Sequence, residues 1–100
     1  MERTLIKDLT EKIDQQVTLK GWLQTLRDQK SMQFLILRDR TGLTQVAHWK
    51  KGNPELAELI STLGTESALT ITGKVVANEV VKLGGIEIQL ESLKVENNAE

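Results

Sequence analysis

Several residue types that carry chemistry in proteins are missing or rare in this 100-residue chain. It has no cysteine, one histidine, one proline and three aromatic residues. Without cysteine, and with a single imidazole, it has no disulfide framework, no thiol nucleophile and no zinc site of the usual Cys/His kind. It also lacks a glycine-rich phosphate loop and an HExxH spacing. These absences favour a binding role over catalysis by this chain.

Long hydrophobic runs are absent as well. The longest apolar stretches, such as 35–37 and 75–77, are far shorter than the ~20 residues that cross a bilayer. The charged start Met1-Glu2-Arg3 leads into no signal-peptide core. We therefore expect a protein that neither spans a membrane nor is secreted, and we predict a cytoplasmic location. With 39% hydrophobic and 27% charged residues, the composition is that of one globular domain.

The net charge of −1 conceals an uneven charge distribution. Residues 20–51 carry seven lysines or arginines and two aspartates, a balance of +5. Residues 52–100 carry three lysines and eight glutamates, a balance of −5. The basic stretch favours a polyanionic partner, because phosphate contacts act over a short, screened range. Charged side chains that only keep a sheet soluble are an equally good explanation.

Alternation of apolar and polar residues predicts five strands. The predicted strands are 16–27, 33–38, 43–49, 67–77 and 86–90. Gly21 lies inside the first strand and has no side chain to pack, which indicates a bulge or a sharp bend there. Residues 39–42 form a turn between the second and third strands. In the second strand, the pattern puts Phe34 and Arg38 on the face opposite to Leu35.

Between the third and fourth strands the apolar period becomes helical. The spacing i, i+3, i+4, i+7 places on one helical face the residues Leu56, Leu59, Ile60 and Leu63. Asn53 is a suitable N-cap, Pro54 suits the first helical position, and Gly64 ends the helix. A short helical lead-in is consistent with Leu5, Leu9 and Ile13.

Three strands, a helix and two further strands form the element order of the OB-fold. We therefore predict an all-β protein with one helix: a five-stranded Greek-key OB-fold barrel with its helix between strands three and four. A simple β-sandwich needs no helix at that place, and a parallel α/β unit needs strands and helices to alternate throughout.

Barrels of this class bind single-stranded nucleic acid by stacking bases on aromatic rings in a basic groove. Phe34 is the stacking candidate here, although phenylalanine is more often a core residue. Gln45 carries an amide that can donate to and accept from a base edge. Arg27 can contact a phosphate or a base, or pair with Asp28 or Asp39.

The remaining ring residues are expected to be structural. We predict that Trp22 and Trp49 pack at the ends of the barrel, and that His48 lies on the surface of its strand.

Six short motifs occur in order along residues 4–99. They are Gly21-Trp22-Leu23, Arg27-Asp28, FLILRDRTG at 34–42, Gln45-Val46, Gly73-Lys74-Val75 and Gly85-Ile86-Glu87-Ile88. Together they resemble the N-terminal anticodon-binding domain of aspartyl- and asparaginyl-tRNA synthetases, which are class II ligases. Residues 35–42 are most similar to the archaeal-type branch, in which some members charge both tRNAs.

The resemblance implies a set of nucleic-acid-binding residues. In that family the middle anticodon uridine stacks on the phenylalanine matched by Phe34 and is read by the glutamine matched by Gln45. The arginine matched by Arg27 contacts the anticodon loop, and the glutamate matched by Glu87 helps to set the third anticodon position. From the basic stretch we add Lys30 and Lys50 as phosphate contacts.

The resemblance also implies what lies outside this chain. The family's catalytic domain is absent, so we expect an excised domain: 1–15 a lead-in, 16–96 the OB-fold anticodon-binding domain, and 97–100 the start of a linker. The chain itself is expected to be no enzyme and to carry no catalytic residue, metal or cofactor. ATP and Mg²⁺ would serve the absent domain, through which the parent ligase would form a homodimer. The expected partner is the anticodon loop of aspartate or asparagine tRNA.

Three alternatives stay open at this point. The chain could be a free-standing single-strand binder without sequence preference, or an OB domain that binds proteins. It could also be the OB domain of a lysyl-tRNA synthetase, although those usually carry a longer helical lead-in.

Overall fold

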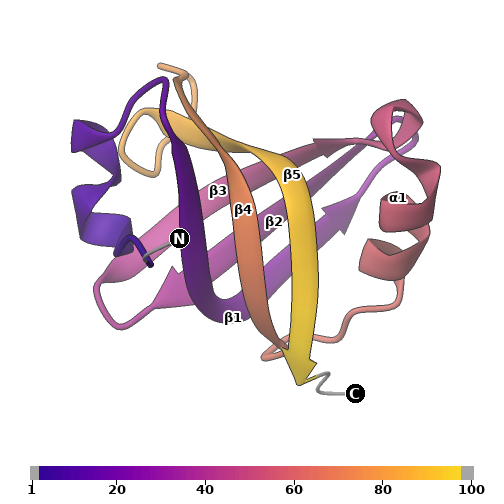
Figure 1. The fold of residues 1–100 in the computed structure, drawn as a ribbon. Helices are drawn as coiled ribbons and strands as arrows, with labels where there is room; N and C mark the ends of the chain where they lie inside the picture. The colour runs from indigo at the N-terminus through magenta and orange to yellow at the C-terminus, as the bar shows by residue number, and fades with distance from the viewer. Residues whose placement is uncertain (1–2, 98–100) are drawn as a thin grey trace.

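The strands of this protein close into a barrel. A computed structural model of the chain describes residues 3–97. The elements are η1 (Ile6–Glu11), β1 (Gln16–Asp28), β2 (Met32–Asp39), β3 (Gly42–Trp49), η2 (Lys50–Gly52), α1 (Pro54–Ser61), β4 (Ala68–Ala77) and β5 (Ile86–Asn97), where η denotes a 3-10 helix. The strand order around the barrel is β1-β2-β3-β5-β4 (Figure 1). Among the strands of residues 3–97, only β3 and β5 pair in parallel. The closed barrel with α1 between β3 and β4 confirms the predicted OB-fold.

β1 belongs to both halves of the barrel. Its first part, up to Trp22, pairs with β4, and its second part, from Trp22 onward, pairs with β2. The strand therefore curves strongly as it changes partner (Figure 1). A Cβ on Gly21 would overlap the carbonyl oxygen of Arg38, so only glycine allows this approach. The irregular register follows two residues later, between Leu23 and Thr25.

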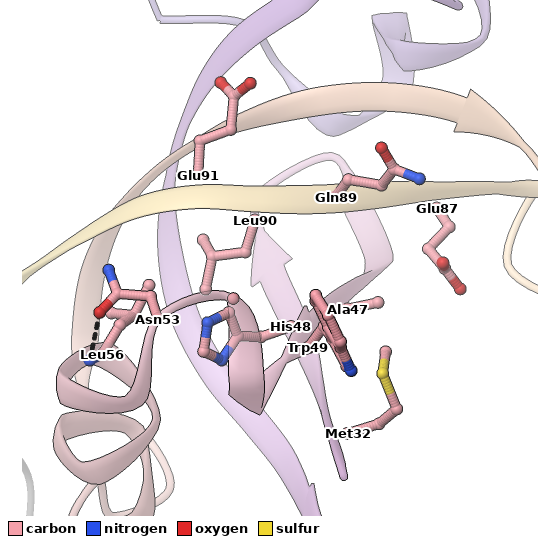
Figure 2. A pocket seen from close by; sticks show the side chains of 11 residues that line it. Met32, Ala47, His48, Trp49, Asn53, Leu56, Glu87, Gln89, Leu90 and Glu91 are labelled. Atoms are coloured by element: carbon pink, nitrogen blue, oxygen red, sulfur yellow. Dashed lines mark hydrogen bonds between the residues drawn. The ribbon is translucent and has the colours of Figure 1, made fainter.

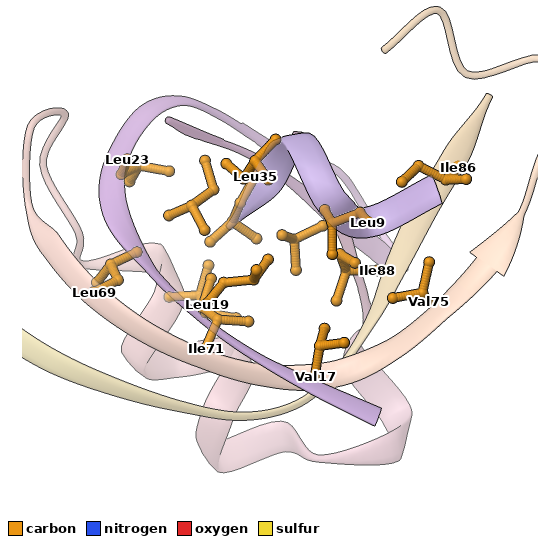
Figure 3. Packing of buried hydrophobic residues seen from close by; sticks show 14 of the residues in the cluster. Leu9, Val17, Leu19, Leu23, Leu35, Leu69, Ile71, Val75, Ile86 and Ile88 are labelled. Carbon is orange, nitrogen blue, oxygen red and sulfur yellow. The ribbon is translucent and has the colours of Figure 1, made fainter. Parts of the chain in front are cut away.

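Aliphatic side chains fill the barrel interior (Figure 3). Those with no exposed surface in the strands include Leu19, Leu23, Leu35, Leu37, Val46, Ile71, Val75 and Ile88. The lead-in adds Ile6 and Leu9 to this cluster. Of the three residues predicted for the lead-in helix only Leu9 joins the core, because Leu5 is half-buried and Ile13 is exposed. η1 and α1 lie on opposite sides of the barrel (Figure 1). The lead-in thus supplies part of the core.

α1 begins as the sequence predicts and ends earlier. The Asn53 side-chain oxygen accepts a hydrogen bond from the Leu56 N–H at 3.1 Å, and Pro54 is the first helical residue. The helix stops at Ser61, before Gly64. The prediction for Leu59 is wrong, because this side chain is 40% exposed. The buried arc runs through Leu56, Ala57 and Ile60, and at 3.6 residues per turn position 59 falls outside it.

β5 is longer than predicted and continues from Leu90 to Asn97. Its inward-leaning apolar residues change from even positions, ending at Leu90, to odd positions at Leu93 and Val95. The change coincides with an irregular register against β4, between Thr72 and Gly73. A bulge of this kind interrupts the alternation on which the sequence prediction depended. Residues 98–100 of the expected linker lie outside the described residues, and no helix within 3–97 has the length and apolar character to cross a membrane.

Candidate nucleic-acid interface

β2, β3 and β5 present one continuous outer surface. Even-numbered residues of β2, odd-numbered residues of β3 and the odd positions 87 and 89 of β5 point outward, because their neighbours fill the core. Pairing arranges the outward residues in rows. Between β2 and β3 the rows are Ile36 with Gln45, Phe34 with Ala47, and Met32 with Trp49. The parallel pairing of Ala47 with Gln89 extends the second row to β5.

Four of the six predicted binding residues line one groove on this surface. The groove has a volume of about 650 Å³ and contains Arg27, Phe34, Gln45 and Glu87. Its other wall is the loop between β4 and β5, from Asn78 to Leu83. The four predicted residues come from four strands, so the barrel brings together positions that are up to 60 residues apart.

The aromatic ring of the groove lies beside a cation. Phe34 is half-buried, and the guanidinium carbon of Arg27 lies 5.6 Å from its ring centroid. The contact arises because Arg27 and Phe34 are directly paired between β1 and β2. Arg38, which the sequence places beside Phe34, instead lies 5.8 Å from the ring centroid of Trp22, its own β1 partner. It also donates two hydrogen bonds to Glu66, which lower the pKa of that carboxyl.

The amide of the groove is held by a carboxylate. Gln45 Nε2 donates to Glu87 Oε2 at 3.0 Å, and Asn78 Nδ2 donates to the same oxygen at 3.4 Å. An ionised carboxylate only accepts hydrogen bonds, so the nitrogen end of the Gln45 amide must face Glu87. The predicted residues Gln45 and Glu87 therefore form one hydrogen-bonded unit. Asn78, which completes it, carries no motif that would have identified it in the sequence.

The two predicted lysines lie outside the groove. Lys30 is exposed in the loop between β1 and β2, and Lys50 lies in η2. The backbone N–H of Lys50 donates to Ser31 O at 3.0 Å, so η2 contacts that loop. Lys50 Nζ lies 2.6 Å from Asp28 Oδ1, and this hydrogen bond lowers the pKa of Asp28 despite partial desolvation. The lysines thus flank one end of the outer surface.

The prediction for His48 is wrong, because this residue is buried with only 4% exposure. Its Nδ1 lies 3.0 Å from Gln33 Oε1, while Gln33 Nε2 donates to Ala57 O at 2.9 Å. Since the Gln33 nitrogen is committed to α1, its oxygen must accept from a protonated Nδ1. Burial lowers the pKa of His48, so the ring is neutral near pH 7. His48 points inward like Val46, and Gln33 links it to Ala57 of α1.

The two tryptophans also differ from expectation. Trp22 is 43% exposed and Trp49 is 57% exposed, so neither is packed into an end of the barrel. Trp49 points to the same outer face of β3 as Gln45, because the two residues are an even number of positions apart. Strand alternation could have predicted this from the sequence. Within residues 3–97, no three His, Asp or Glu side chains are grouped so that they could hold a metal ion.

An aromatic ring, a cation and an amide on the outer face of a closed five-stranded barrel define a nucleic-acid-binding protein of the OB class. The tRNA anticodon family, described as an OB-fold nucleic acid binding domain, matches residues 17–96, and the chain belongs to this family.

Individual relatives show which enzymes carry a similar domain. The chain is 40% identical over its whole length to an asparagine tRNA ligase of Desulforamulus reducens and 41% identical to an aspartate tRNA(Asp) ligase of Thermoplasma volcanium. It covers 23% of each ligase. The solved asparaginyl-tRNA synthetase of Pyrococcus horikoshii, complexed with asparaginyl-adenylate, matches with a TM-score of 0.92 and 30% identity over 100% of this chain and 23% of that one. The resemblance to the OB-fold domain of aspartyl- and asparaginyl-tRNA synthetases is thereby confirmed.

Proposed function

We propose that the groove between the barrel face and the β4–β5 loop reads the anticodon loop of an aspartate or asparagine tRNA. The observation that carries this proposal is the convergence of Arg27, Phe34, Gln45 and Glu87 in one groove. The matched relatives are aspartate and asparagine ligases, which favours this function over that of a lysyl enzyme.

Each side chain of the groove has a distinct role in this proposal. The ring of Phe34 offers a stacking surface for an unpaired base, and such a stack is worth about 1–3 kcal/mol. The guanidinium of Arg27 lies beside the ring, within reach of the phosphate of the stacked nucleotide. Gln45 can accept from the imino hydrogen of a uridine and donate to its O4 carbonyl, which a cytidine does not offer.

The test uses the 100-residue chain and two anticodon stem-loop RNAs that differ only in a middle uridine or cytidine. We expect the uridine loop to bind more tightly by about 1–3 kcal/mol, with an affinity that falls steeply as salt is added. Phe34→Ala should weaken both loops, whereas Gln45→Ala should bind both weakly and alike. Fluorescence anisotropy measures the binding of the unmodified chain and of both variants to each of the two loops.

Each alternative has its own outcome. Equal binding of the two loops by the unmodified chain would indicate a single-strand binder without sequence preference. Absent or salt-insensitive binding would favour a protein-binding OB domain and would overturn the proposal.

We further propose that the chain is one domain of a longer cytoplasmic ligase. It spans 23% of the two ligases compared above, which is consistent with a module that has no chemistry of its own. Residues 16–96 would form the anticodon-binding domain, 1–15 its lead-in and 97–100 the start of a linker. ATP, Mg²⁺ and the contacts of a homodimer would belong to a catalytic part outside this chain. Sequencing the reading frame beyond codon 100 tests this proposal, and a stop codon there would contradict it.

A further inference from the structure

A second cleft opens next to the groove, where β3 and β5 separate. The two strands pair only at Val46 with Ile88 and at Ala47 with Gln89. Beyond this short ladder they diverge towards η2 and α1 and leave a cleft of about 420 Å³ (Figure 2). Glu87 lines both the cleft and the groove, so the two are continuous.

Trp49 stands exposed in this cleft. More than half of the residue is in contact with solvent, at 57% exposure. Its ring rests against η2: a Cβ on Gly52 would lie 3.3 Å from the ring atom Cε3. The small residue lets the indole lie over the backbone instead of entering the core. Exposing so large an apolar ring forgoes the burial that usually stabilises tryptophan, and such surfaces often mark binding sites.

The position of Trp49 relative to Phe34 suits neighbouring nucleotides. Phe34 is paired with Ala47, and Trp49 lies two residues further along the same face of β3. The two aromatic residues are therefore diagonal neighbours, about 7–8 Å apart at the backbone. Ala47, the β3 partner of Phe34, has a side chain too small to obstruct either ring.

Polar and charged groups complete the cleft. Gln89 is exposed, and its amide can both donate to and accept from a base edge. Lys50 and Lys51 follow Trp49 directly in η2. Lys51 is exposed, whereas Lys50 is half-buried and paired with Asp28. The acidic residue Glu91 points away from Trp49 (Figure 2) and accepts a hydrogen bond from Gln16 at 2.7 Å.

We propose that this cleft is a second nucleobase site, in which the base adjacent to the one on Phe34 stacks on Trp49 and meets Gln89 at its edge. This inference rests on the proposed function. The occupant is an unpaired RNA base because the cleft continues the groove and the exposed Lys51 beside it can contact a phosphate. Its residues Trp49 and Gln89 belong to none of the motifs that carry the family resemblance.

The first experiment observes Trp49 without removing it. In Trp22→Phe, Trp49 is the chain's only tryptophan, so its fluorescence reports on its own surroundings. We expect the aspartate anticodon stem-loop to quench this fluorescence with the same midpoint as in anisotropy. The matched control, Trp49→Phe, retains only Trp22 and should show little change. Binding by anisotropy with no change in the Trp49 signal would overturn the proposal.

The second experiment separates base stacking from a general structural effect. We expect Trp49→Ala to weaken the intact stem-loop roughly fivefold to 150-fold, the equivalent of one base stack. A loop that is abasic at the first or at the third anticodon position should remove the difference between the two proteins, because the base that Trp49 stacks on is then missing. An equal loss of affinity with the intact and both abasic loops would overturn the proposal.

The Phe34→Ala variant distinguishes failure of the second base site from failure of the proposed anticodon reading. If Phe34→Ala weakens binding and Trp49→Ala does not, the groove is the RNA site and the second site is refuted. If the unmodified chain binds no stem-loop, the proposed function fails and the second site with it. Thermal melting of Trp49→Ala should match that of the unmodified chain, because the residue lies outside the core cluster.

Discussion

The amide nitrogen of Gln45 donates to the carboxylate of Glu87 at 3.0 Å. This contact joins a residue of β3 to a residue of β5 and determines which end of the amide faces the groove. A glutamine that could rotate freely by half a turn would match uridine in one orientation and cytidine in the other. Glu87 permits only the orientation with nitrogen towards itself, because a carboxylate cannot donate.

We predict that Glu87→Gln relaxes the choice of middle base. A glutamine at position 87 can donate as well as accept, so Gln45 gains the second orientation. The cytidine loop should then bind more tightly than it does to the unmodified chain, by about 1 kcal/mol, the typical net value of one hydrogen bond. Anisotropy titrations with the uridine and cytidine loops measure the change. An unchanged preference for uridine would show that Glu87 does not orient Gln45.

The lysines at the edge of the surface should act on phosphates and not on bases. We predict that Lys30→Ala weakens the uridine and cytidine loops by the same factor and reduces the slope of log affinity against log salt by about 1. Lys50→Ala should have a smaller effect, because Lys50 is already paired with Asp28 at 2.6 Å. Titrations over a series of salt concentrations give both slopes. A change in base preference in either variant would contradict a phosphate role.

His48 should make the fold sensitive to mild acid. Burial lowers its pKa in the folded chain, so the unfolded chain binds the additional proton first as pH falls. Its contribution to stability is therefore complete above the unfolded value of about 6.5 and decreases below it. His48→Asn retains a donor near the Nδ1 position but does not titrate. We expect urea unfolding to show a smaller loss of stability from about pH 7.5 to about pH 5 in the variant. An equal loss in both proteins would refute this role.

Asp39 should contribute to stability in a lower pH range. The buried carboxylate accepts hydrogen bonds from the Ile6 N–H at 2.9 Å and from the Thr41 N–H and hydroxyl at 2.7 and 2.6 Å. Burial opposes its ionisation, but these donors outweigh burial and lower its pKa from 3.8. The stabilisation is therefore complete above about 3.8 and is lost as the pH falls through the folded pKa.

The corresponding variant is Asp39→Asn. At neutral pH it should lose about 1.5–3 kcal/mol, the range for hydrogen bonds to a charged group, and loosen the contact between η1 and the β2–β3 turn. Its stability should also vary less with pH than that of the unmodified chain below pH 4. Urea unfolding at neutral and acidic pH measures both effects, and identical acid sensitivity would argue against Asp39.

Gly21→Ala tests the close approach of β1 and β2. The added Cβ would overlap the Arg38 carbonyl oxygen, which belongs to backbone and cannot turn aside. We expect a destabilisation of at least about 1–3 kcal/mol, or a melting temperature lower by roughly 5–20 °C for a domain of this size. Gln24→Ala, at an exposed position of the same strand, is the control and should melt close to the unmodified chain. A Gly21→Ala melting temperature equal to the control would refute the overlap.

Local patterns in the sequence determined most elements and their faces. Period-two alternation identified β2 and β3, with Leu35 inside and Phe34 outside, because successive side chains in a strand point to opposite faces. Asn53 and Pro54 marked the start of α1, since capping depends only on neighbouring residues. The end of β5 was missed because a bulge shifts its alternation, and a bulge depends on the partner strand.

The tertiary structure alone determined which residues pair across strands and which side chains are buried. Strand register, which no single strand specifies, placed Arg27 over Phe34 and moved Arg38 to Trp22. Whether an outward or inward position is buried depends on the element that covers it. His48 is buried and linked through Gln33 to α1, whereas Trp49 is exposed where β3 separates from β5. The physical reason is that alternation determines only the direction of a side chain, while its contact with solvent or protein depends on residues distant in the chain.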